Sequence, residues 1–515
     1  MGDVQRCDVL IVGAGPTGLV LALWLARAGI SVRIIDRTAA PGTTSRAIVF
    51  HARNLEFYQQ LGIAQLAVQG GEQLTEGNLW VGGRRVAGIE LGRAGEGVSP
   101  YPFMLIFPQD RQEEMLIGQL ALLNVHVERG TALVSFEQDA DGVHASLQSA
   151  RGIEMIDARY VGGCDGAHST VREVLGTQFT GGTYNHVFYV ADLEATGPVV
   201  DGRLHLALDD ADFLAIFAMK GEGRVRVVGA VQRDAADTAS LGWADVSGHI
   251  AERLHLAATT VRWFSTYRVH HRVADSFRRE RVFLLGDAAH VHSPVGGQGM
   301  NTGIGDAVNL AWKLAAVLRG EASDSVLATY ETERMPFARK LVATTDRAFE
   351  FVSARGRIAA RVRVTVAPLI LPILFRFRAM RRLMFRTLSQ TAIQYRASAL
   401  SRGVAGEIHG GDRLPWVPAA RAGSGDNYTP LTSRQWQLHV FGAATAGTRT
   451  VAQRSGLALH ELPWVPAAAH AGFDENTAYL VRPDGYVGMI VPQSRTVEIE
   501  EYLQTHGLRL DVSTS

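Results

Sequence analysis

The sequence predicts an α/β protein built on a nucleotide-type domain, with an antiparallel sheet inserted into it and a further domain at its C-terminal end. Two stretches predict the nucleotide-type domain: residues 7–36 and 281–318 each contain an apolar strand, a glycine-spaced loop and a helix. The insertion is predicted by residues 184–275, which alternate with a period of two, for example over 187–193, 204–208 and 225–231. Such alternation is typical of an antiparallel sheet.

The first stretch begins with a short strand at residues 7–12 and a helix at 19–28, separated by Gly13, Gly15 and Gly18. A second strand at 31–35 ends at Asp36, 23 positions after Gly13. This order is the fingerprint of a dinucleotide site, in which the helix N-terminus receives a pyrophosphate and the acid binds ribose hydroxyls. The fingerprint does not distinguish FAD from NAD.

Residues 43–62 contain Arg46 and Arg53, and we expect a helix after His51. An arginine can bind a pyrophosphate in bidentate fashion, but an arginine on a helix face is usually a solvated charge. From the residues alone, we interpret both arginines as surface charges. His51 has no metal partner at ligand spacing, so we interpret it as a core or loop histidine.

Glycine and alternating apolar residues at 72–102 predict short strands of a different domain. An apolar segment at 103–107 then leads through Gln109 to a helix at 111–123, and 125–147 reads as two strands joined by a turn.

The segment 160–172 again combines a strand, an acid (Asp165), glycines and a helix start that Ser169 or Thr170 could cap. A purely structural turn and a turn close to a phosphate both remain open.

The second stretch has a strand at 282–285, then Gly286 and Asp287, a loop with three glycines, and a helix at 301–318. The carboxylate can accept hydrogen bonds from hydroxyl groups, and Gly296, Gly297 and Gly299 allow close backbone approach. The helix N-terminus favours negative charge. A reduced flavin, with its ribityl hydroxyls and anionic ring, is a ligand of this kind. His290 and His292 could assist proton movement there, but we interpret them as residues that hold the loop.

The composition excludes several classes of protein. The chain has 515 residues with 51 basic and 51 acidic side chains, so nothing points to a nucleic-acid partner. Its two cysteines, Cys7 and Cys164, allow no disulfide framework, which favours a reducing cytoplasm. We find no signal peptide and no apolar run long enough for stable membrane insertion.

Residues 351–390 carry nine arginines and no Asp or Glu, around an apolar run at 364–375. A membrane-surface or anion-binding patch would fit this charge. We prefer a connecting helical segment with a solvated basic face, because Pro368 and Pro372 interrupt the apolar run.

After a glycine-rich linker at 401–411, the last domain is predicted to contain a strand at 438–441 and a hairpin of 477–482 with 486–490.

The three ordered segments GAGPTG, CDGAHSTVR and LLGDAAHVHSPVGGQGMNTG resemble those of the single-component FAD-dependent aromatic hydroxylases, including phenol, hydroxyphenylpropionate and polyketide hydroxylases. The resemblance covers residues 7 to about 345. LVRPDGYVG, in the last domain, resembles the thioredoxin-like C-terminal domain of the phenol hydroxylase branch. No cysteine follows Cys164, which excludes dithiol chemistry in this domain. The roles that remain for it are folding, stability or subunit contact, as in a homodimer.

The resemblance implies three domains. A discontinuous Rossmann-type FAD-binding domain comprises residues 1–71, 103–180 and 276–400, with a helical segment at 340–400. A substrate-binding sheet domain comprises 72–102 and 181–275, and a thioredoxin-like domain comprises 405–515.

The resemblance also implies the cofactor site and reverses the surface interpretation of Arg46. The family usually has Glu at the position of Asp36, which is one methylene shorter. The implied FAD-binding residues are Gly13, Gly15, Pro16, Thr17, Gly18, Asp36, Arg37, Arg46, Gln109, Asp165, Asp287, Pro294, Gly297, Gly299, Met300 and Asn301. Pro294, Gly296 and Gly297 would face the flavin, and neither a catalytic side chain nor a metal is assigned.

The implied activity is hydroxylation of a phenolic or polycyclic aromatic substrate by molecular oxygen, through a flavin C4a-hydroperoxide, with NADPH or NADH as transient electron donor. Alternatives are a Baeyer–Villiger or epoxidising monooxygenase, and an FAD-retaining protein that binds an aromatic ligand without turnover. Candidate substrate residues lie in the alternating segment: Phe188, Tyr189, His205, Phe213 and Phe217. About half of such a set should point to the wrong face of a sheet.

Overall fold

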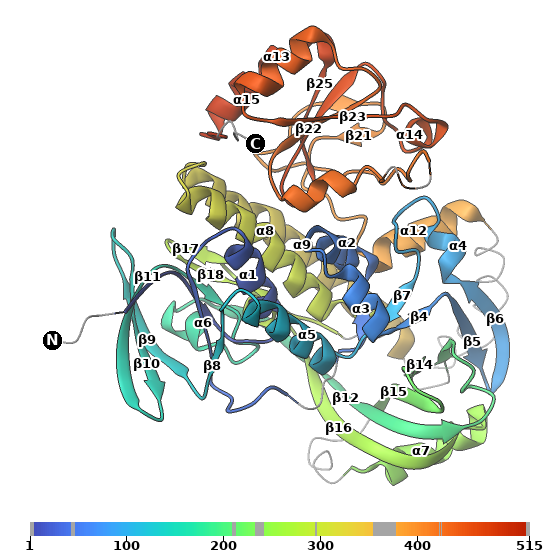
Figure 1. The fold of residues 1–515 in the computed structure, drawn as a ribbon. Helices are drawn as coiled ribbons and strands as arrows, with labels where there is room; N and C mark the ends of the chain where they lie inside the picture. The colour runs from blue at the N-terminus through green and yellow to red at the C-terminus, as the bar shows by residue number, and fades with distance from the viewer. Residues whose placement is uncertain are drawn as a thin grey trace.

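The computed structural model describes residues 5–42, 47–208, 213–231, 241–293, 296–353, 377–421, 423 and 425–510. Four sheets of three or more strands organise this part of the chain, with mixed parallel and antiparallel pairing (Figure 1). None of the helices found in these residues is long and apolar enough to cross a membrane.

The first sheet has a parallel centre in the order β18-β11-β1-β2-β8, and antiparallel strands β17, β10 and β9 extend it. In register, Val12 at the end of β1 lies beside both Gly163 and Ile35, so three strands end together. Loops at this edge of a parallel sheet commonly carry ligand sites. The strands are β1 (Gln5–Val12), β2 (Val32–Asp36), β8 (Val127–Arg129), β9 (Ala132–Gln138), β10 (Val143–Ser149), β11 (Gly152–Gly163), β17 (Arg278–Arg279) and β18 (Val282–Leu284).

Helices α1 (Pro16–Arg27), α5 (Gln109–Ala121), α8 (Gly299–Leu318) and α9 (Ser325–Ser353) pack with this sheet into the main apolar core. The predicted helices are confirmed, but their starts lie two or three residues earlier than the apolar pattern indicated. In α1 the reason is Pro16, which suits a first helical turn because that position needs no amide donor.

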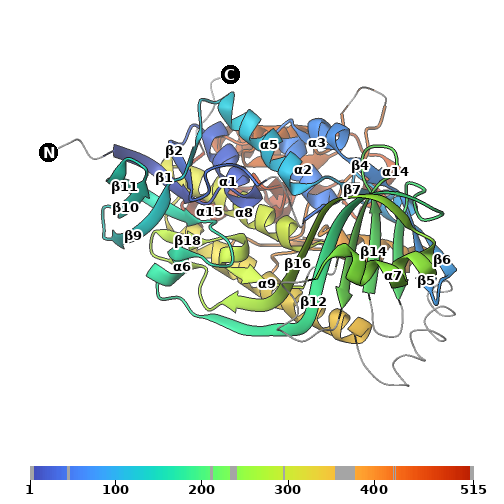
Figure 2. The ribbon, with the colours of Figure 1, turned by 90° about the horizontal axis from the view of Figure 1, so that it is seen from below.

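The second sheet is eight-stranded, in the order β19-β16-β12-β15-β14-β13-β5-β6. Two long strands, β12 and β16, pair along their length and lead from the first sheet into the second (Figure 2). Helix α7 (Trp243–Leu254) covers one face. The strands are β5 (Glu76–Val81), β6 (Arg84–Glu90), β12 (Phe179–Thr196), β13 (Leu204–Leu208), β14 (Phe213–Ala218), β15 (Arg224–Val231), β16 (Ala257–Ala274) and β19 (His290–Val291). The predicted antiparallel strands are therefore confirmed.

A small sheet, β3 (Val49–Phe50), β7 (Met104–Ile106) and β4 (Glu72–Leu74), lies beside the second sheet and shares an apolar cluster with it. The neighbouring helices are α2 (Ala52–Gln60), α3 (Ala64–Gly70) and α4 (Leu91–Gly95). Helix α12 (Arg378–Leu388) packs on α4 through Phe385.

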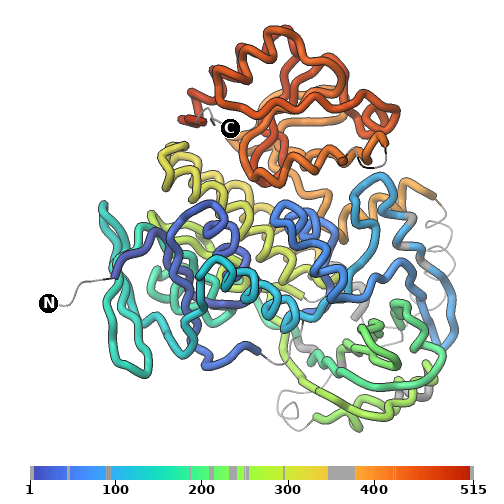
Figure 3. Tube along the Cα trace, in the orientation of Figure 1, coloured from blue at the N-terminus to red at the C-terminus, as the bar shows by residue number. Residues whose placement is uncertain are grey.

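The C-terminal residues form a four-stranded sheet in the order β23-β22-β24-β25, placed over α8 and α9 (Figure 3). Its strands are β22 (Gln437–Phe441), β23 (Ala458–Leu462), β24 (Thr477–Val481) and β25 (Val487–Pro492), which confirms the predicted hairpin. Helices α13 (Ala446–Arg454), α14 (Pro466–His470) and α15 (Val497–Thr505) flank it, and a short pair, β20 (Val404–Ala405) with β21 (Ile408–His409), precedes it.

Candidate functional site

The glycine loop between β1 and α1 opens onto a pocket. Gly13 has φ +103°, and a Cβ there would lie 2.3 Å from the carbonyl oxygen of Cys164. A Cβ on Gly18 would lie 2.0 Å from the Gly13 carbonyl oxygen, whereas a Cβ on Gly15 would meet no atom within 4 Å. Gly13 and Gly18 therefore serve close packing, and Gly15 leaves space for a ligand.

Helix α1 begins at this space without a side-chain cap. Gly15 is the N-cap residue, Pro16 starts the helix, and no acidic side chain lies in the first turn. Uncapped amide groups and the helix dipole favour a bound anion. A pyrophosphate therefore fits the residues present here.

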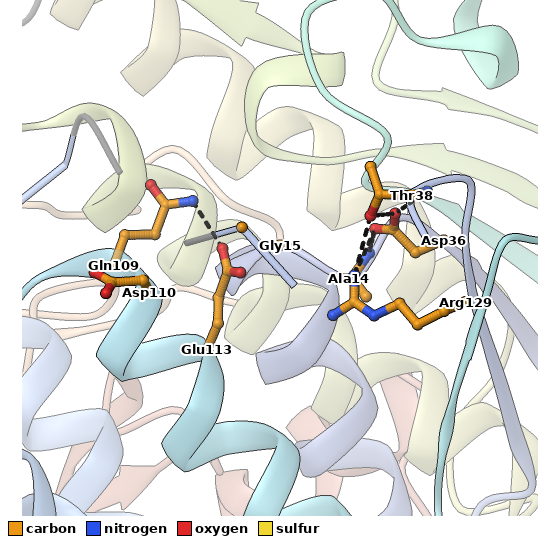
Figure 4. Close-up of a pocket in the computed structure, with 9 residues that line it drawn as sticks. Ala14, Gly15, Asp36, Thr38, Gln109, Asp110, Glu113 and Arg129 are labelled. Carbon is orange, nitrogen blue, oxygen red and sulfur yellow. Dashed lines mark hydrogen bonds and ion pairs between the residues drawn. The ribbon is translucent and has the colours of Figure 1, made fainter. Parts of the chain in front are cut away.

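The pocket has a volume of about 150 Å³. Its lining residues, drawn in Figure 4, are Ala14, Gly15, Asp36, Thr38, Gly42, Gln109, Asp110, Glu113 and Arg129. Among the residues predicted to bind FAD, Gly15, Asp36 and Gln109 thus meet at one place. Arg37 is exposed and is not part of the lining.

Asp36 is held at the pocket wall by its neighbours. One carboxylate oxygen accepts from the amide of Ala14 at 2.8 Å, and the other accepts from the amide and hydroxyl of Thr38 at 2.8 and 2.6 Å. The guanidinium of Arg129 lies 3.6 Å away. These contacts fit an ionised acid whose position is fixed before a ribose arrives.

Glu113 and Arg129 were not predicted from the sequence. Glu113 lies one helical turn after Gln109 on α5, and its Oε1 accepts from the Gln109 amide at 2.8 Å (Figure 4). The i, i+4 spacing with Gln109 was a usable signal for Glu113. No such signal existed for Arg129, because only the pairing of β8 with β2 brings it to the pocket.

Asp165, in the central segment, uses its carboxylate within its own turn. The carboxylate accepts from the Ser169 hydroxyl at 2.6 Å and from the Val171 amide at 3.1 Å. Ser169 in turn caps helix α6 (Thr170–Val174). Burial raises the pKa of Asp165 above its ordinary value, although these hydrogen bonds act against the rise. The contacts favour the structural interpretation of this turn.

Arg172, just after that turn, joins the central segment to the loop of the second stretch. Its guanidinium donates to the carbonyl oxygen of Ala288 at 2.9 Å and to that of Ala167 at 2.8 Å. The acid of the second stretch, Asp287, is exposed, whereas Gly286 and Ala288 on either side are buried.

Thr17 marks the place where α1, the Gly286 turn and α8 meet. A Cβ on Gly286, which has φ +57°, would lie 2.7 Å from the Thr17 hydroxyl oxygen, and a Cβ on Gly303 would lie 2.3 Å from it. The two glycine-containing stretches thus form one site.

The loop before α8 is held by the buried side chain of Asn301. Its amide donates to the carbonyl oxygens of Val49 at 2.8 Å and Gly297 at 2.7 Å, and its oxygen accepts from the His51 amide at 2.8 Å. Gly297 has φ +63°, and a Cβ there would lie 2.7 Å from the Val49 side chain. The side chain of Asn301 therefore uses these hydrogen bonds to hold the loop in position.

His51 supports the same loop, as expected for a core or loop histidine. Its Nε2 donates to the Gly296 carbonyl oxygen at 2.9 Å. Burial lowers the pKa of His51 to about 4, so the ring is neutral at physiological pH. Met300, on the first turn of α8, packs partly buried against the main core.

His290 and His292 differ in their surroundings. Buried His290 donates to Asp306 at 2.7 Å, and Asp306 also accepts from Arg334 at 2.6 Å and from the Gly286 amide at 3.0 Å. His292 donates from Nδ1 to the Ser293 carbonyl oxygen at 2.8 Å, and burial lowers its pKa to about 4. These contacts support the interpretation that both histidines hold structure.

The second sheet presents one face to the small sheet and thereby to the loop. Leu204, Ala218 and Met219 cluster there with Val49, and Phe217 packs at the edge of the cluster. In register, Phe188 opposes Ala230, which opposes position 213, four residues before Phe217, so Phe188 lies on the same face as Phe217. Phe188 stacks on Tyr267 with ring centroids 5.8 Å apart.

The other two candidates, Tyr189 and His205, lie on the face that α7 covers. Tyr189 stacks on Phe264 at 6.2 Å within the α7 cluster. His205 accepts from the Trp80 indole at 2.9 Å and donates to Asp201 at 2.7 Å. Strand alternation explains this separation.

Some expectations concern residues outside the described part of the chain. These are Arg46, Pro294, the side chain of Phe213 and most of the basic segment, residues 354–376. Within the described residues, no group of three or more His, Cys, Asp and Glu could hold a metal ion.

Fold and site together define a protein of the dinucleotide-binding class, in which the two glycine-containing stretches lie against each other at Thr17. The model of the family described as FAD binding domain matches residues 6–345. 6-Methylpretetramide 4-monooxygenase of Streptomyces rimosus is 33% identical over 96% of this chain and 93% of its own length. Pentachlorophenol 4-monooxygenase of Sphingobium chlorophenolicum is 35% identical over 71% of this chain and 69% of its own length.

Among solved structures, anhydrotetracycline hydroxylase from Streptomyces rimosus superimposes with a TM-score of 0.78 at 29% identity, over 98% of this chain and 99% of its own. The chain belongs to the FAD binding domain family, in the group of single-component FAD-dependent aromatic hydroxylases. It is a flavoprotein monooxygenase, and its cofactor is FAD.

Proposed function

We propose that the protein hydroxylates a phenolic or polycyclic aromatic compound with molecular oxygen and NADPH or NADH. The observation that carries this proposal is the similarity over nearly the whole chain to monooxygenases whose names specify such substrates. When bound, FAD supplies the electron-transfer and oxygen-activating chemistry.

The residues of this chain bind and orient the cofactor. Gly15 and the uncapped start of α1 receive the pyrophosphate, Asp36 binds the adenosine ribose, and exposed Asp287 accepts hydrogen bonds from the ribityl chain. Helix α8 has neither a side-chain cap nor an acid in its first turn. Its N-terminus would therefore stabilise negative charge on a bound flavin.

The second sheet, with residues 72–102 and 181–275, forms the substrate-binding domain in this proposal. Its face toward the small sheet is lined by apolar side chains, including Phe188, Leu204 and Phe217. Such a face accepts a flat aromatic ring and excludes water from the reacting atoms. Tyr189 and His205 serve the packing of α7 instead.

The four-stranded C-terminal sheet with its flanking helices, within residues 405–515, corresponds to the thioredoxin-like domain of the proposal. Without a cysteine after Cys164, its contribution is packing against α8 and α9. The discontinuous remainder, residues 1–71, 103–180 and 276–400, forms the Rossmann-type FAD-binding domain.

The test is oxidation of NADH and NADPH by the FAD-loaded protein across a panel of phenols and polycyclic aromatic compounds, with oxygen uptake and product mass. We expect one compound class to stimulate oxidation and to gain one oxygen atom. Ring expansion or epoxide formation would instead indicate the related oxygenations, and tight ligand binding without stimulation would contradict turnover altogether.

Phe217→Ala tests whether the apolar face of the second sheet binds the substrate. We expect a higher KM and more oxygen consumed without product, because the apolar wall is opened. Tyr189→Phe, on the opposite face, should leave both quantities unchanged.

A further inference from the structure

The pocket beside α1 carries more negative charge than a pyrophosphate favours. Of the lining residues that the structure describes, three are carboxylates, Asp36, Asp110 and Glu113, and one is a guanidinium, Arg129. An anionic ligand entering such a pocket raises the cost of keeping every carboxylate ionised. Asp36 is surrounded by donors from Ala14 and Thr38, which stabilise its charge.

Glu113 has different surroundings. Glu113 is 7% exposed, and within the part of the chain that the structure describes its carboxylate accepts a hydrogen bond from the neutral amide of Gln109 at 2.8 Å. Figure 4 shows its carboxyl group pointing into the pocket on the side of Gly15. A pyrophosphate at the start of α1 would therefore lie close to this acid.

The charged groups around Glu113 come from three elements. Asp110 lies on its own helix, Asp36 at the end of β2, and Arg129 on β8, while the first turn of α1 contributes no acidic side chain. Burial raises the pKa of Glu113 above its ordinary value; the Gln109 hydrogen bond and Arg129 oppose the rise, and Asp36 and Asp110 add to it. Two phosphate charges would act in the same direction as these acids.

We propose that Glu113 is a positioning residue of the FAD site that holds the Gln109 amide at the pocket and binds a proton when FAD binds. The proton comes from solvent and returns to it when FAD leaves. Because the proposal concerns cofactor retention, it does not depend on the identity of the aromatic substrate.

The test measures the FAD dissociation constant of the full-length holoenzyme between pH 5.5 and 8.5, from the flavin fluorescence released on dilution. We compare the wild type with two variants. Glu113→Gln keeps an acceptor oxygen but removes the charge, and Glu113→Ala removes the acceptor oxygen as well as the charge. The control is Glu114→Gln, because Glu114 is exposed on the same helix and pairs only with exposed Arg111 among the ion pairs of the described residues.

For the wild type, and for Glu114→Gln, the dissociation constant should rise with pH by up to about tenfold per pH unit, the slope for one linked proton. Glu113→Gln should show no such slope and should bind FAD more tightly than the wild type at pH 8.5. Glu113→Ala should also lose the slope but bind severalfold more weakly than Glu113→Gln.

Three results would overturn the proposal. If the pH dependence of the dissociation constant is retained in Glu113→Gln, or is absent from the wild type, the linked proton is not bound by Glu113. Equal dissociation constants for Glu113→Gln and Glu113→Ala would remove its role in positioning Gln109. FAD content at pH 6 shows separately that each variant still forms the cofactor site.

Discussion

Arg482, in the turn after β24, donates to both carboxylate oxygens of Glu333 on α9, at 2.7 and 3.0 Å. Both side chains are completely buried. Lys313 on α8 also donates to Glu333, at 2.8 Å, so the C-terminal sheet is joined to α9 and to α8, which begins just after the turn at Gly296 and Gly297, the flavin loop. Burial opposes ionisation of Glu333, but Arg482 and Lys313 outweigh it and hold its pKa well below the ordinary value.

Replacing one member of this cluster should be strongly destabilising. Glu333→Gln leaves the ammonium of Lys313 buried without its counter-charge, which typically costs about 3 to 5 kcal/mol, whereas Arg482 keeps its buried ion pair with Asp484 at 2.7 Å. We expect the free energy of unfolding in urea to fall by that amount, with FAD saturating throughout.

The exposed ion pair between Arg449 and Glu461 provides the control. Glu461→Gln should leave the free energy of unfolding almost unchanged, because water screens the pair. A similar cost for both variants would show that burial of the Glu333 cluster contributes nothing.

Two glycines of the first loop should respond in opposite ways to alanine. Gly13→Ala places a Cβ 2.3 Å from the Cys164 carbonyl oxygen at φ +103°, so the protein should lose at least about 2 kcal/mol of stability. Gly15→Ala meets no protein atom within 4 Å and should leave thermal unfolding of the FAD-free protein unchanged. Its methyl group would lie where we propose that the pyrophosphate binds, so FAD affinity should fall about tenfold or more, some 1.4 kcal/mol.

Calorimetry of the FAD-free variants and FAD titration separate these effects. A stable Gly15→Ala variant with unchanged FAD affinity would place the pyrophosphate elsewhere.

The sequence was sufficient to predict the elements around the cofactor because their signals are local. Asp36 follows a strand at a fixed distance from Gly13, and Gly286 with Asp287 follows another. Periodicity likewise predicted β13 and β15 to within a residue. Helix starts were less accurate because Pro16 and Gly299, which begin α1 and α8, fall outside the apolar pattern.

The residues that could not be predicted depend on contacts distant in sequence. Arg129 reaches the pocket through the pairing of β8 with β2, and Asp306 meets Arg334 from a different helix. The face of each substrate candidate depended on strand register, which placed His205 toward α7 and Phe217 toward the flavin loop.

Asp287→Ala should weaken FAD retention. Its carboxylate is exposed at the joint between the two glycine-containing stretches, where a ribityl chain would lose a charged acceptor worth roughly 1.5 to 3 kcal/mol. We expect a tenfold or greater rise in the FAD dissociation constant, measured by flavin fluorescence. Asp141→Ala, in an exposed turn between β9 and β10, should have no effect, and an unchanged dissociation constant in Asp287→Ala would remove Asp287 from the site.

Acid should destabilise the C-terminal sheet through His439. Its side chain is fully buried on β22, and burial, with a smaller contribution from His460, lowers its pKa to about 3. A histidine whose pKa is lower in the folded state binds its proton preferentially when unfolded, so stability is complete above pH 6.5 and falls as the pH drops from 6.5 toward 3. By pH 4 the loss of stability from this residue should approach roughly 3 kcal/mol.

Urea unfolding at successive pH values should show a shallower decline for His439→Gln than for the wild type, whereas His470→Gln, at an exposed position, should follow the wild type. Parallel curves for all three proteins would place the acid sensitivity at other groups, of which His51, at the flavin loop, is the first to test by the same substitution.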